Sequence, residues 1–217
     1  EIVLMHDLTT GRTCDKDWLV TAKTVDELKT LNAAWWFDPQ KDGSFPLRNQ
    51  AIRIPTLEEV LALFAEEKSL GAIAWIDTKD DKEYTITENS GLYDRLIELV
   101  GHFELWQEII IEVGSVNQAE ALRKRDSRIQ TAYWASNLPA VQEAILYPGY
   151  VQIGISLSLA NEAAQLIKAS GKELQVNDRQ FSKEEWNTVL QFSPDFIGTD
   201  YYRELLRWLG NRPSDER

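Results

Sequence analysis

The sequence has little of the residue types that mark several common classes of protein. Cys14 is the single cysteine among 217 residues, so an internal disulfide and a cysteine metal cluster are both excluded. Histidine is almost as scarce, with only His6 and His102. No apolar run approaches the ~18 residues of a membrane span, and no glycine-rich phosphate loop is present. What remains is a globular chain, 43% hydrophobic, with ample material for one sizeable core.

Positive charge is also in deficit. The chain carries 35 acidic and 23 basic residues, for a net charge of −12 and a pI of about 4.7. A surface this acidic repels phosphate backbones, so nucleic acid is not an expected partner. The short basic cluster Arg123-Lys124-Arg125 falls near a predicted helix end, where cations are favoured for a local reason.

The beginning of the chain is unusual, because it starts at Glu1 rather than at methionine. No signal peptide is visible, so we expect the native start to have been removed. We expect a soluble protein, and the sequence leaves export, compartment and oligomeric state open.

Apolar runs of strand length alternate with helical patterns along the whole chain. Capping boxes mark helix starts at Thr24–Glu27, Thr56–Glu59 and Ser182–Glu185. Further helices are predicted at 88–100, from Asn117, at 137–146 and at 160–169. Strands are predicted at 2–5, 72–76, 108–113, 129–134, 150–155, 174–176 and 196–198. Such alternation with short connections is typical of βαβ units on a parallel sheet.

We therefore predict a single α/β domain over residues 1–217. A (β/α)8 barrel is favoured over a doubly wound sheet, because the polar strand ends are scattered over many strands. The absence of a glycine-rich phosphate loop supports the same choice.

Several of the predicted strands end in polar side chains. These ends are His6-Asp7, Asp77-Thr78-Lys79, Asn177-Asp178 and Thr199-Asp200. In α/β proteins, chemistry collects at the carboxyl edge of the strands. We therefore expect convergence on one face of the sheet for His6, Asp77, Lys79 and Asp200.

The order and spacing of several short segments are more specific than any one segment alone. They are Ile2–Asp7 followed by Arg12-Thr13, Val25–Leu28, Ile54–Leu61, Ile76–Lys79, Val176–Asp178 and Thr199–Tyr201. This series resembles the glycerophosphodiester phosphodiesterase family over nearly the whole chain. The resemblance implies a (β/α)8 barrel and hydrolysis of a glycerol-headgroup phosphodiester.

The resemblance also implies that an amino-terminal part is absent. Members of the family begin with a strand ending in His-Arg-Gly, a helix with Glu-Asn-Thr and a strand with Glu-x-Asp. These supply one catalytic histidine and two metal carboxylates, and neither histidine here is followed by Arg-Gly. We therefore expect about six of the eight barrel units, and upstream residues that complete the barrel. The 217-residue stretch alone should then bind metal poorly and turn over little substrate.

The family pattern implies a role for four side chains. His6 would be the general acid on the leaving alcohol. Asp77 would be a ligand of a divalent metal, Mg²⁺ or Ca²⁺, which screens and polarises the phosphate. Arg12 and Lys79 would bind the phosphodiester substrate. The chain departs from the pattern in having Asp77 for the usual Glu and Leu174-Gln175 for the usual Trp-Thr.

Plainer interpretations of the same residues stay open. A strand-end histidine such as His6 can be structural, and Asp7 can either orient His6 or cap the following loop. Asp77 can cap a turn beside Asp80, and Lys79 can be a solvated side chain of a charged loop.

Glu112 interrupts the apolar run Ile109–Ile111, where a buried carboxylate needs a partner or a cation. It can face the barrel mouth or point outward under a helix, and the sequence does not choose.

The irregular stretch 33–54 is long for a loop without a function, and it contains Trp35 and Trp36. We expect it to fold over the substrate-binding face.

Three functions are consistent with these patterns. The leading one is a metal-dependent hydrolase that converts glycerophosphodiesters to glycerol phosphate and an alcohol. The second is a degenerate, non-catalytic barrel that only binds such molecules, favoured by the shortened Asp77. The third is a phosphodiester lyase of the related phospholipase type.

Overall fold

The computed structural model describes residues 1–38, 43–67, 71–78, 91–177 and 182–210. The chain divides into two compact units, one made of residues 1–74 and 79–109 and the other of residues 75–78 and 110–217. Each unit has its own buried residues. The expectation of one domain over residues 1–217 stays a prediction.

The first unit is mostly irregular chain with short helices. They are η1 (Val20–Ala22), α1 (Val25–Leu28), α2 (Leu57–Glu67) and α3 (Leu92–His102). The predicted capping box at α1 is confirmed, since Thr24 Oγ1 accepts from Glu27 N (3.2 Å) and Glu27 Oε2 accepts from Thr24 N (2.9 Å). Thr56 and Glu59 make the same reciprocal pair before α2. Both helices therefore begin where the local sequence predicts.

The segment 2–5 is not the barrel strand predicted for it. Leu4 N–H donates to Pro55 O (3.0 Å), Leu57 N–H donates to Ile2 O (2.9 Å), and Val3 forms one isolated antiparallel bridge with Thr56. The backbone groups of this apolar run are thus satisfied by the start of α2 rather than by a parallel strand.

One hydrophobic cluster in the core of the first unit is formed by residues far apart in sequence. Val3 and Met5, both partly buried, pack against it. Its buried members are Cys14, Leu28, Leu31 and Ile54. The run 2–5 is therefore apolar because it contributes to this core, although it is not a sheet strand.

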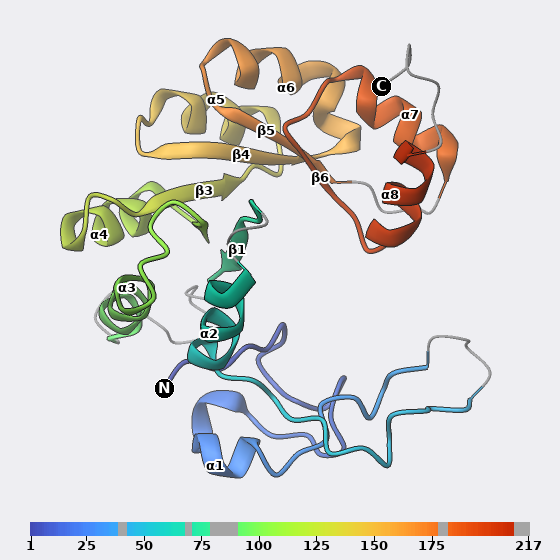
Figure 1. The fold of residues 1–217 in the computed structure, drawn as a ribbon. Coiled ribbons are helices and arrows are strands. Elements are labelled where there is room, and N and C mark those ends of the chain that lie inside the picture. Colours follow the sequence, from blue (N-terminus) through green and yellow to red (C-terminus); the bar gives the residue numbers. More distant parts are fainter. Residues whose placement is uncertain (39–42, 68–70, 79–90, 178–181, 211–217) are drawn as a thin grey trace. The chain divides into compact units, whose positions relative to one another are not determined.

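A six-stranded sheet organises the second unit (Figure 1). Its strands are β1 (Ala74–Asp77), β2 (Ile109–Val113), β3 (Gln130–Trp134), β4 (Tyr150–Ser156), β5 (Glu173–Asn177) and β6 (Phe196–Gly198). Neighbouring strands from β2 to β6 pair in parallel, and the hydrogen bonds Ala74 N→Glu108 O and Thr78 N→Glu112 O advance equally along β1 and β2. The predicted α/β class with parallel strands is confirmed.

Strand order distinguishes a barrel-type sheet from a doubly wound one. The strands are arranged β1-β2-β3-β4-β5-β6, strictly in chain order. A doubly wound sheet reverses its order at a switch point. The sequential order therefore agrees with the predicted barrel type.

Helices follow the strands and cover one face of the sheet (Figure 1). They are α4 (Val116–Arg125), α5 (Leu138–Leu146), α6 (Leu157–Ala169), α7 (Lys183–Gln191) and α8 (Tyr202–Gly210). The N-cap of α4 is Ser115, whose hydroxyl accepts from Gln118 N, so the prediction of Asn117 was two residues late. Gly171 follows α6 with φ +77, the left-handed conformation that a helix stop requires.

The two faces of the sheet differ in chemistry, because side chains alternate along each strand. On the helix-covered face, the residues are apolar and buried: Ile111, Val113, Ile153, Leu174 and Val176. The opposite face, called the polar face here, carries Glu112, Trp134, Gln152, Gln175 and Asn177, which the strand registers place on one side.

Asn137 provides a test of how far one helix cap stabilises this unit. Its Oδ1 accepts from Ala140 N at 3.0 Å and caps α5, as the sequence predicts. Asn137→Ala should lower the free energy of unfolding by about 1 kcal/mol. Urea denaturation measures the change. Asn161→Ala, on the exposed surface of α6, should cause no such loss, and equal losses in both variants would contradict the capping account.

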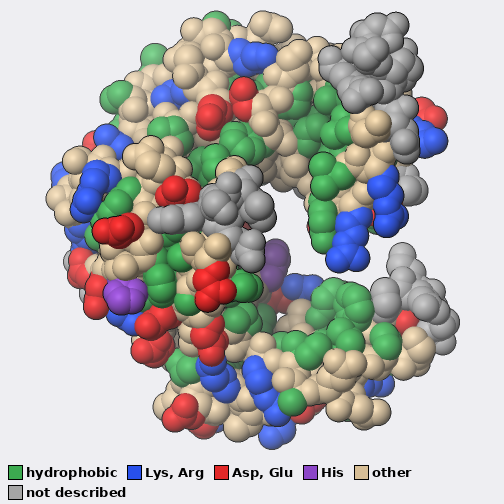
Figure 2. Space-filling view, in the orientation of Figure 1, with side chains coloured by type: hydrophobic (Ala, Val, Ile, Leu, Met, Phe, Trp, Pro, Cys, Tyr) green, Lys and Arg blue, Asp and Glu red, His purple; other side chains and the backbone are tan. Residues whose placement is uncertain are grey.

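Acidic side chains are spread over the visible surface in Figure 2, with lysine and arginine among them. Among the described residues, none of the helices has the length and apolar character needed to cross a bilayer.

Candidate active site

A contiguous polar cluster follows the segment 2–5 in the first unit. His6 Nδ1 lies 2.5 Å from Asp7 Oδ1, and Arg12 Nε donates to Asp7 Oδ2. An ionised carboxylate only accepts hydrogen bonds, so Nδ1 of His6 carries the proton and Nε2 is left for other partners. The His6 side chain is 74% exposed. Asp7 therefore orients the His6 ring, which was one of the two roles open for it.

Asp7 is held in its ionised form by both neighbours. Its pKa is lowered from 3.8 to about 2, chiefly by the hydrogen bond from Arg12 and then by that from His6. A carboxyl group whose pKa is lower in the folded state stabilises the fold above the unfolded pKa. That contribution is present above pH 3.8 and is lost as the pH falls through about 2.

Arg12→Ala should therefore raise the pKa of Asp7, because the largest cause of the depression is removed. Carbon NMR of the Asp7 carboxyl, titrated from neutral to acid pH, measures this directly. Lys16→Ala removes a cation from the same loop whose ammonium lies over Trp18 instead, and should leave the Asp7 titration unchanged. An unchanged pKa in Arg12→Ala would contradict the assigned cause.

The loop that carries Arg12 is fixed by its own hydrogen bonds. Thr10 is fully buried, and its hydroxyl donates to Lys16 O (2.7 Å) while accepting from Trp18 N (3.0 Å). Gly11 N donates to Asp17 Oδ1, and a Cβ on Gly11 would lie 2.5 Å from Asp17 Cγ. Arg12 therefore lies in a turn that is fixed by hydrogen bonds. A side chain at position 11 would clash with Asp17.

Asp77 ends β1 in the second unit and is exposed. Trp75 Nε1 donates to Glu112 Oε2 at 3.1 Å, which puts Trp75 on the polar face. Asp77, two residues further along the strand, shares that face. Thr78 N donates to Glu112 O at 3.2 Å, so the ends of the two strands meet at the level of Asp77 and Glu112. Of the two orientations open for Glu112, the structure has the one away from the covering helices.

Aromatic and amide side chains adjoin on the same polar face. A Cβ on Gly154 would lie 2.7 Å from Trp134 Cε3 and 3.8 Å from Gln175 Cδ, so the Trp134 ring rests on the bare backbone of β4. Gln175 Nε2 donates to Asn177 Oδ1 at 2.7 Å. The Trp134 ring thus lies beside Gln175 on the polar face, whereas Leu174 is buried on the opposite, helix-covered face.

The predicted site residues fall into two groups. His6 and Arg12 meet through Asp7 in the first unit, and Asp77 lies beside Glu112 in the second. Lys79 lies outside the described residues. Convergence of the predicted residues on one face stays a prediction.

The sequence reasoning missed Trp75 and Trp134 as polar-face residues and left Glu112 undecided. For Glu112 the available signal was its place between the buried aliphatic residues Ile111 and Val113.

Metal binding was predicted for Asp77 alone. Among the residues that the structure describes, no group of three or more His, Cys, Asp or Glu side chains is arranged to hold a metal ion. Asp77 and Glu112 offer hard oxygen donors of the kind that Mg²⁺ and Ca²⁺ take. By their chemistry, Asp77 and Glu112 are suited to provide some of the ligands of such an ion.

The long loop of the first unit presents aromatic rings to solvent. Trp35 is 40% and Trp36 50% exposed, and the Arg48 guanidinium lies 4.6 Å from the Trp35 ring centroid. The loop is anchored by Asn32, whose Nδ2 donates to Arg48 O. Its placement over a substrate stays a prediction.

The chain is similar in sequence to a known phosphodiesterase. The glycerophosphodiester phosphodiesterase of Bacillus subtilis (strain 168) is 26% identical over 148 residues, which are 65% of this chain and 44% of that protein. The match thus spans less than half of the relative's length.

Solved structures share the fold at low identity. A phosphodiesterase of Oleispira antarctica, determined in complex with the product sn-glycerol-3-phosphate, superposes with a TM-score of 0.73 at 19% identity, covering 96% of this chain and 79% of that one. A glycerophosphodiester phosphodiesterase of Agrobacterium tumefaciens strain C58 gives 0.70 at 17% identity, covering 91% and 77%. The sequence model of the glycerophosphoryl diester phosphodiesterase family matches residues 1–202, and the chain belongs to that family.

Proposed function

We propose that this protein hydrolyses glycerophosphodiesters to glycerol phosphate and an alcohol, with a divalent metal. Family membership over residues 1–202 supports the substrate class. The relative from Oleispira antarctica was solved with sn-glycerol-3-phosphate as its product. The observation that carries the proposal is the exposed His6 ring, held through Nδ1 by Asp7 in a His-Asp pair that resembles the family's.

His6 serves as the general acid in this proposal. In this role the ring is protonated on both nitrogens: Nδ1–H donates to Asp7, and Nε2 gives its proton to the oxygen of the leaving alcohol, which leaves a neutral imidazole. Imidazole exchanges protons readily near neutral pH, which suits this task. Asp7 acts as the positioning residue, because it bonds the far side of the ring.

Arg12 binds the phosphodiester in this proposal. Its Nε is used by Asp7, which leaves the two terminal nitrogens to donate to phosphate oxygens. The side chain is 57% exposed and so accessible to a ligand. Lys79 is proposed as a second cationic contact on the basis of the sequence alone.

Asp77 and Glu112 are proposed as the metal-binding carboxylates of this stretch. A divalent cation, when bound, screens the phosphate charge and polarises it toward attack by water. Trp75 holds Glu112 in place through its indole N–H. The proposal that His6 and Asp77 serve one site rests on the strand-end pattern and on family membership.

A non-catalytic binding barrel is the second candidate. The observation that favours it is the shorter Asp77 in place of the family's glutamate. The Trp134 ring beside Gln175 favours ligand binding at the polar face, because it provides an aromatic surface there.

Turnover of glycerophosphocholine, followed by phosphorus NMR, tests the proposal. The metal-stripped protein is assayed before and after addition of Mg²⁺ or Ca²⁺. We expect metal-dependent appearance of glycerol phosphate as the first product. A terminal cyclic phosphate would support the lyase instead. Binding without any turnover in the complete protein would support the non-catalytic barrel.

A further inference from the structure

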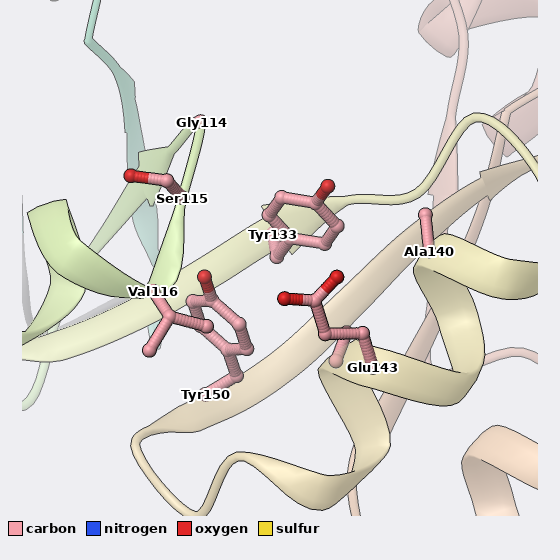
Figure 3. A pocket seen from close by; sticks show the side chains of 8 residues that line it. Gly114, Ser115, Val116, Tyr133, Ala140, Glu143 and Tyr150 are labelled. Carbon is pink, nitrogen blue, oxygen red and sulfur yellow. The ribbon is translucent and has the colours of Figure 1, made fainter.

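A cavity lies on the helix-covered side of the sheet, opposite to the polar face. It has a volume of about 190 Å³. Its walls come from the turn before α4, from β3, from α5 and from the start of β4 (Figure 3). The lining includes Gly114, Ser115, Tyr133, Glu143 and Tyr150. The cavity belongs entirely to the second unit and shares no residue with the proposed active site.

The Tyr150 hydroxyl has unmet hydrogen-bonding capacity in this cavity. Tyr150 is only 2% exposed, and its hydroxyl has no partner among the described residues. A buried hydroxyl without a partner is costly, so such groups normally meet a ligand or an ordered water. Burial, with smaller contributions from Tyr133, Tyr147 and Glu143, raises the pKa of the phenol well above its usual range. The hydroxyl therefore stays neutral and can accept or donate.

Glu143 adds an uncompensated negative charge to the same cavity. Figure 3 shows its carboxylate extending from α5 toward the Tyr133 and Tyr150 rings. It forms no ion pair or hydrogen bond with the part of the chain that the structure describes, and the residue is exposed. A cation entering from solvent can therefore reach it.

The aromatic rings narrow the choice of ligand. Tyr133 and Tyr150 stack with centroids 5.3 Å apart and an interplanar angle of 22°. Aromatic rings attract organic cations, and the methyl groups of Val116, Ala140 and Ala144 suit a short alkyl chain. Anions are disfavoured by Glu143. Divalent metal ions need more hard oxygen ligands than one carboxylate and one phenol.

We propose that this cavity binds a small organic ammonium ion, with the ammonium N–H groups donating to Glu143 and to the Tyr150 hydroxyl. The alkyl part of the ligand lies against the tyrosine rings and the alanine methyl groups. The volume is sufficient for a molecule of a few heavy atoms.

Titration with ethylammonium chloride, followed by NMR shifts of the Tyr133, Ala144 and Tyr150 signals, tests the proposal. We expect saturable shifts, and binding of ethanol at least about tenfold weaker, because ethanol has the same heavy-atom count without the charge. Glu143→Gln should weaken ethylammonium binding at least about tenfold. Glu162→Gln removes the same charge from an exposed position of α6 and should leave the ethylammonium affinity unchanged.

Tyr150→Phe should also weaken binding by a factor of several, whereas Tyr147→Phe should not, since Tyr147 is outside the lining. His6→Ala should bind ethylammonium normally, so the outcome is independent of the proposed hydrolase. Absence of saturable shifts in the unmodified protein would mean that water alone fills the cavity and would overturn the proposal. Equal affinity in Glu143→Gln and the unmodified protein would overturn it as well.

Discussion

His6→Ala should reduce hydrolysis of glycerophosphocholine by about 10²–10⁴-fold while leaving the protein folded. The variant lacks the imidazole that we propose as the general acid for the leaving alcohol. The side chain is 74% exposed, so little packing is lost with it. The melting temperature should move by no more than about 2 °C. Initial rates at saturating substrate, together with thermal melts of the same samples, measure both effects.

The other histidine of the chain provides the matched control. His102 is exposed at the end of α3 and contacts the Phe103 ring edge-on, with centroids 4.7 Å apart. His102→Ala should keep full activity. Retained activity in His6→Ala, combined with a large fall in its melting temperature, would assign His6 a structural role and contradict the proposal.

Asp77→Ala should weaken divalent-metal binding by more than about 100-fold and reduce hydrolysis in step. Removal of a residue that only hydrogen-bonds to a metal ligand already lowers metal affinity by about 10- to 100-fold, and loss of the ligand itself should cost more. Glu112→Gln should act in the same direction, since the amide oxygen can still accept from Trp75 Nε1 while the charge is gone. Isothermal titration with Mg²⁺ measures affinity without depending on turnover.

The length of the Asp77 side chain gives a sharper version of this test. Asp77→Glu restores the family's residue and should bind metal at least as tightly as the unmodified protein. Asp26→Glu, which lengthens an exposed carboxylate of α1 in the same way, should leave the metal affinity unchanged. Unchanged Mg²⁺ affinity in both Asp77→Ala and Glu112→Gln would exclude these carboxylates as ligands.

Local sequence rules predicted local structure well. The capping boxes of Thr24 with Glu27 and Thr56 with Glu59 follow from a spacing of three residues and are confirmed. Asn137 was also identified as an N-cap by its place before the Pro139 turn. In each case the partners are close in sequence, so a single window contains the whole interaction.

Local sequence rules did not predict which distant segments pair with one another. The run 2–5 has the composition of a buried strand, yet its backbone pairs with residues 55–57. Composition reports burial, whereas a strand also needs lateral partners that no local window reveals. Glu112 stayed undecided for a related reason, since a carboxylate inside an apolar run is compatible with either face of a sheet.

The sequence indicated which kinds of side chain form the candidate site, but not all of the residues that lie together in it. Asp7, His6 and Arg12 are near in sequence, and the structure brings them together. Trp75, Glu112 and Trp134 come from three strands, and only the registers place them on one face. The tyrosine cavity was not predicted, because Tyr133, Glu143 and Tyr150 are spread over three elements and none is unusual alone.

We propose that His6 and a divalent metal held by Asp77 and Glu112 serve the same hydrolytic reaction. The most direct measurement is paramagnetic broadening by Mn²⁺, which takes the same oxygen ligands as Mg²⁺. The imidazole signals of His6 are assigned by comparison with the spectrum of His6→Ala. The account predicts that Mn²⁺ broadens the His6 signals, and that Asp77→Ala abolishes the effect. Sharp His6 signals at Mn²⁺ saturation of the unmodified protein would contradict it.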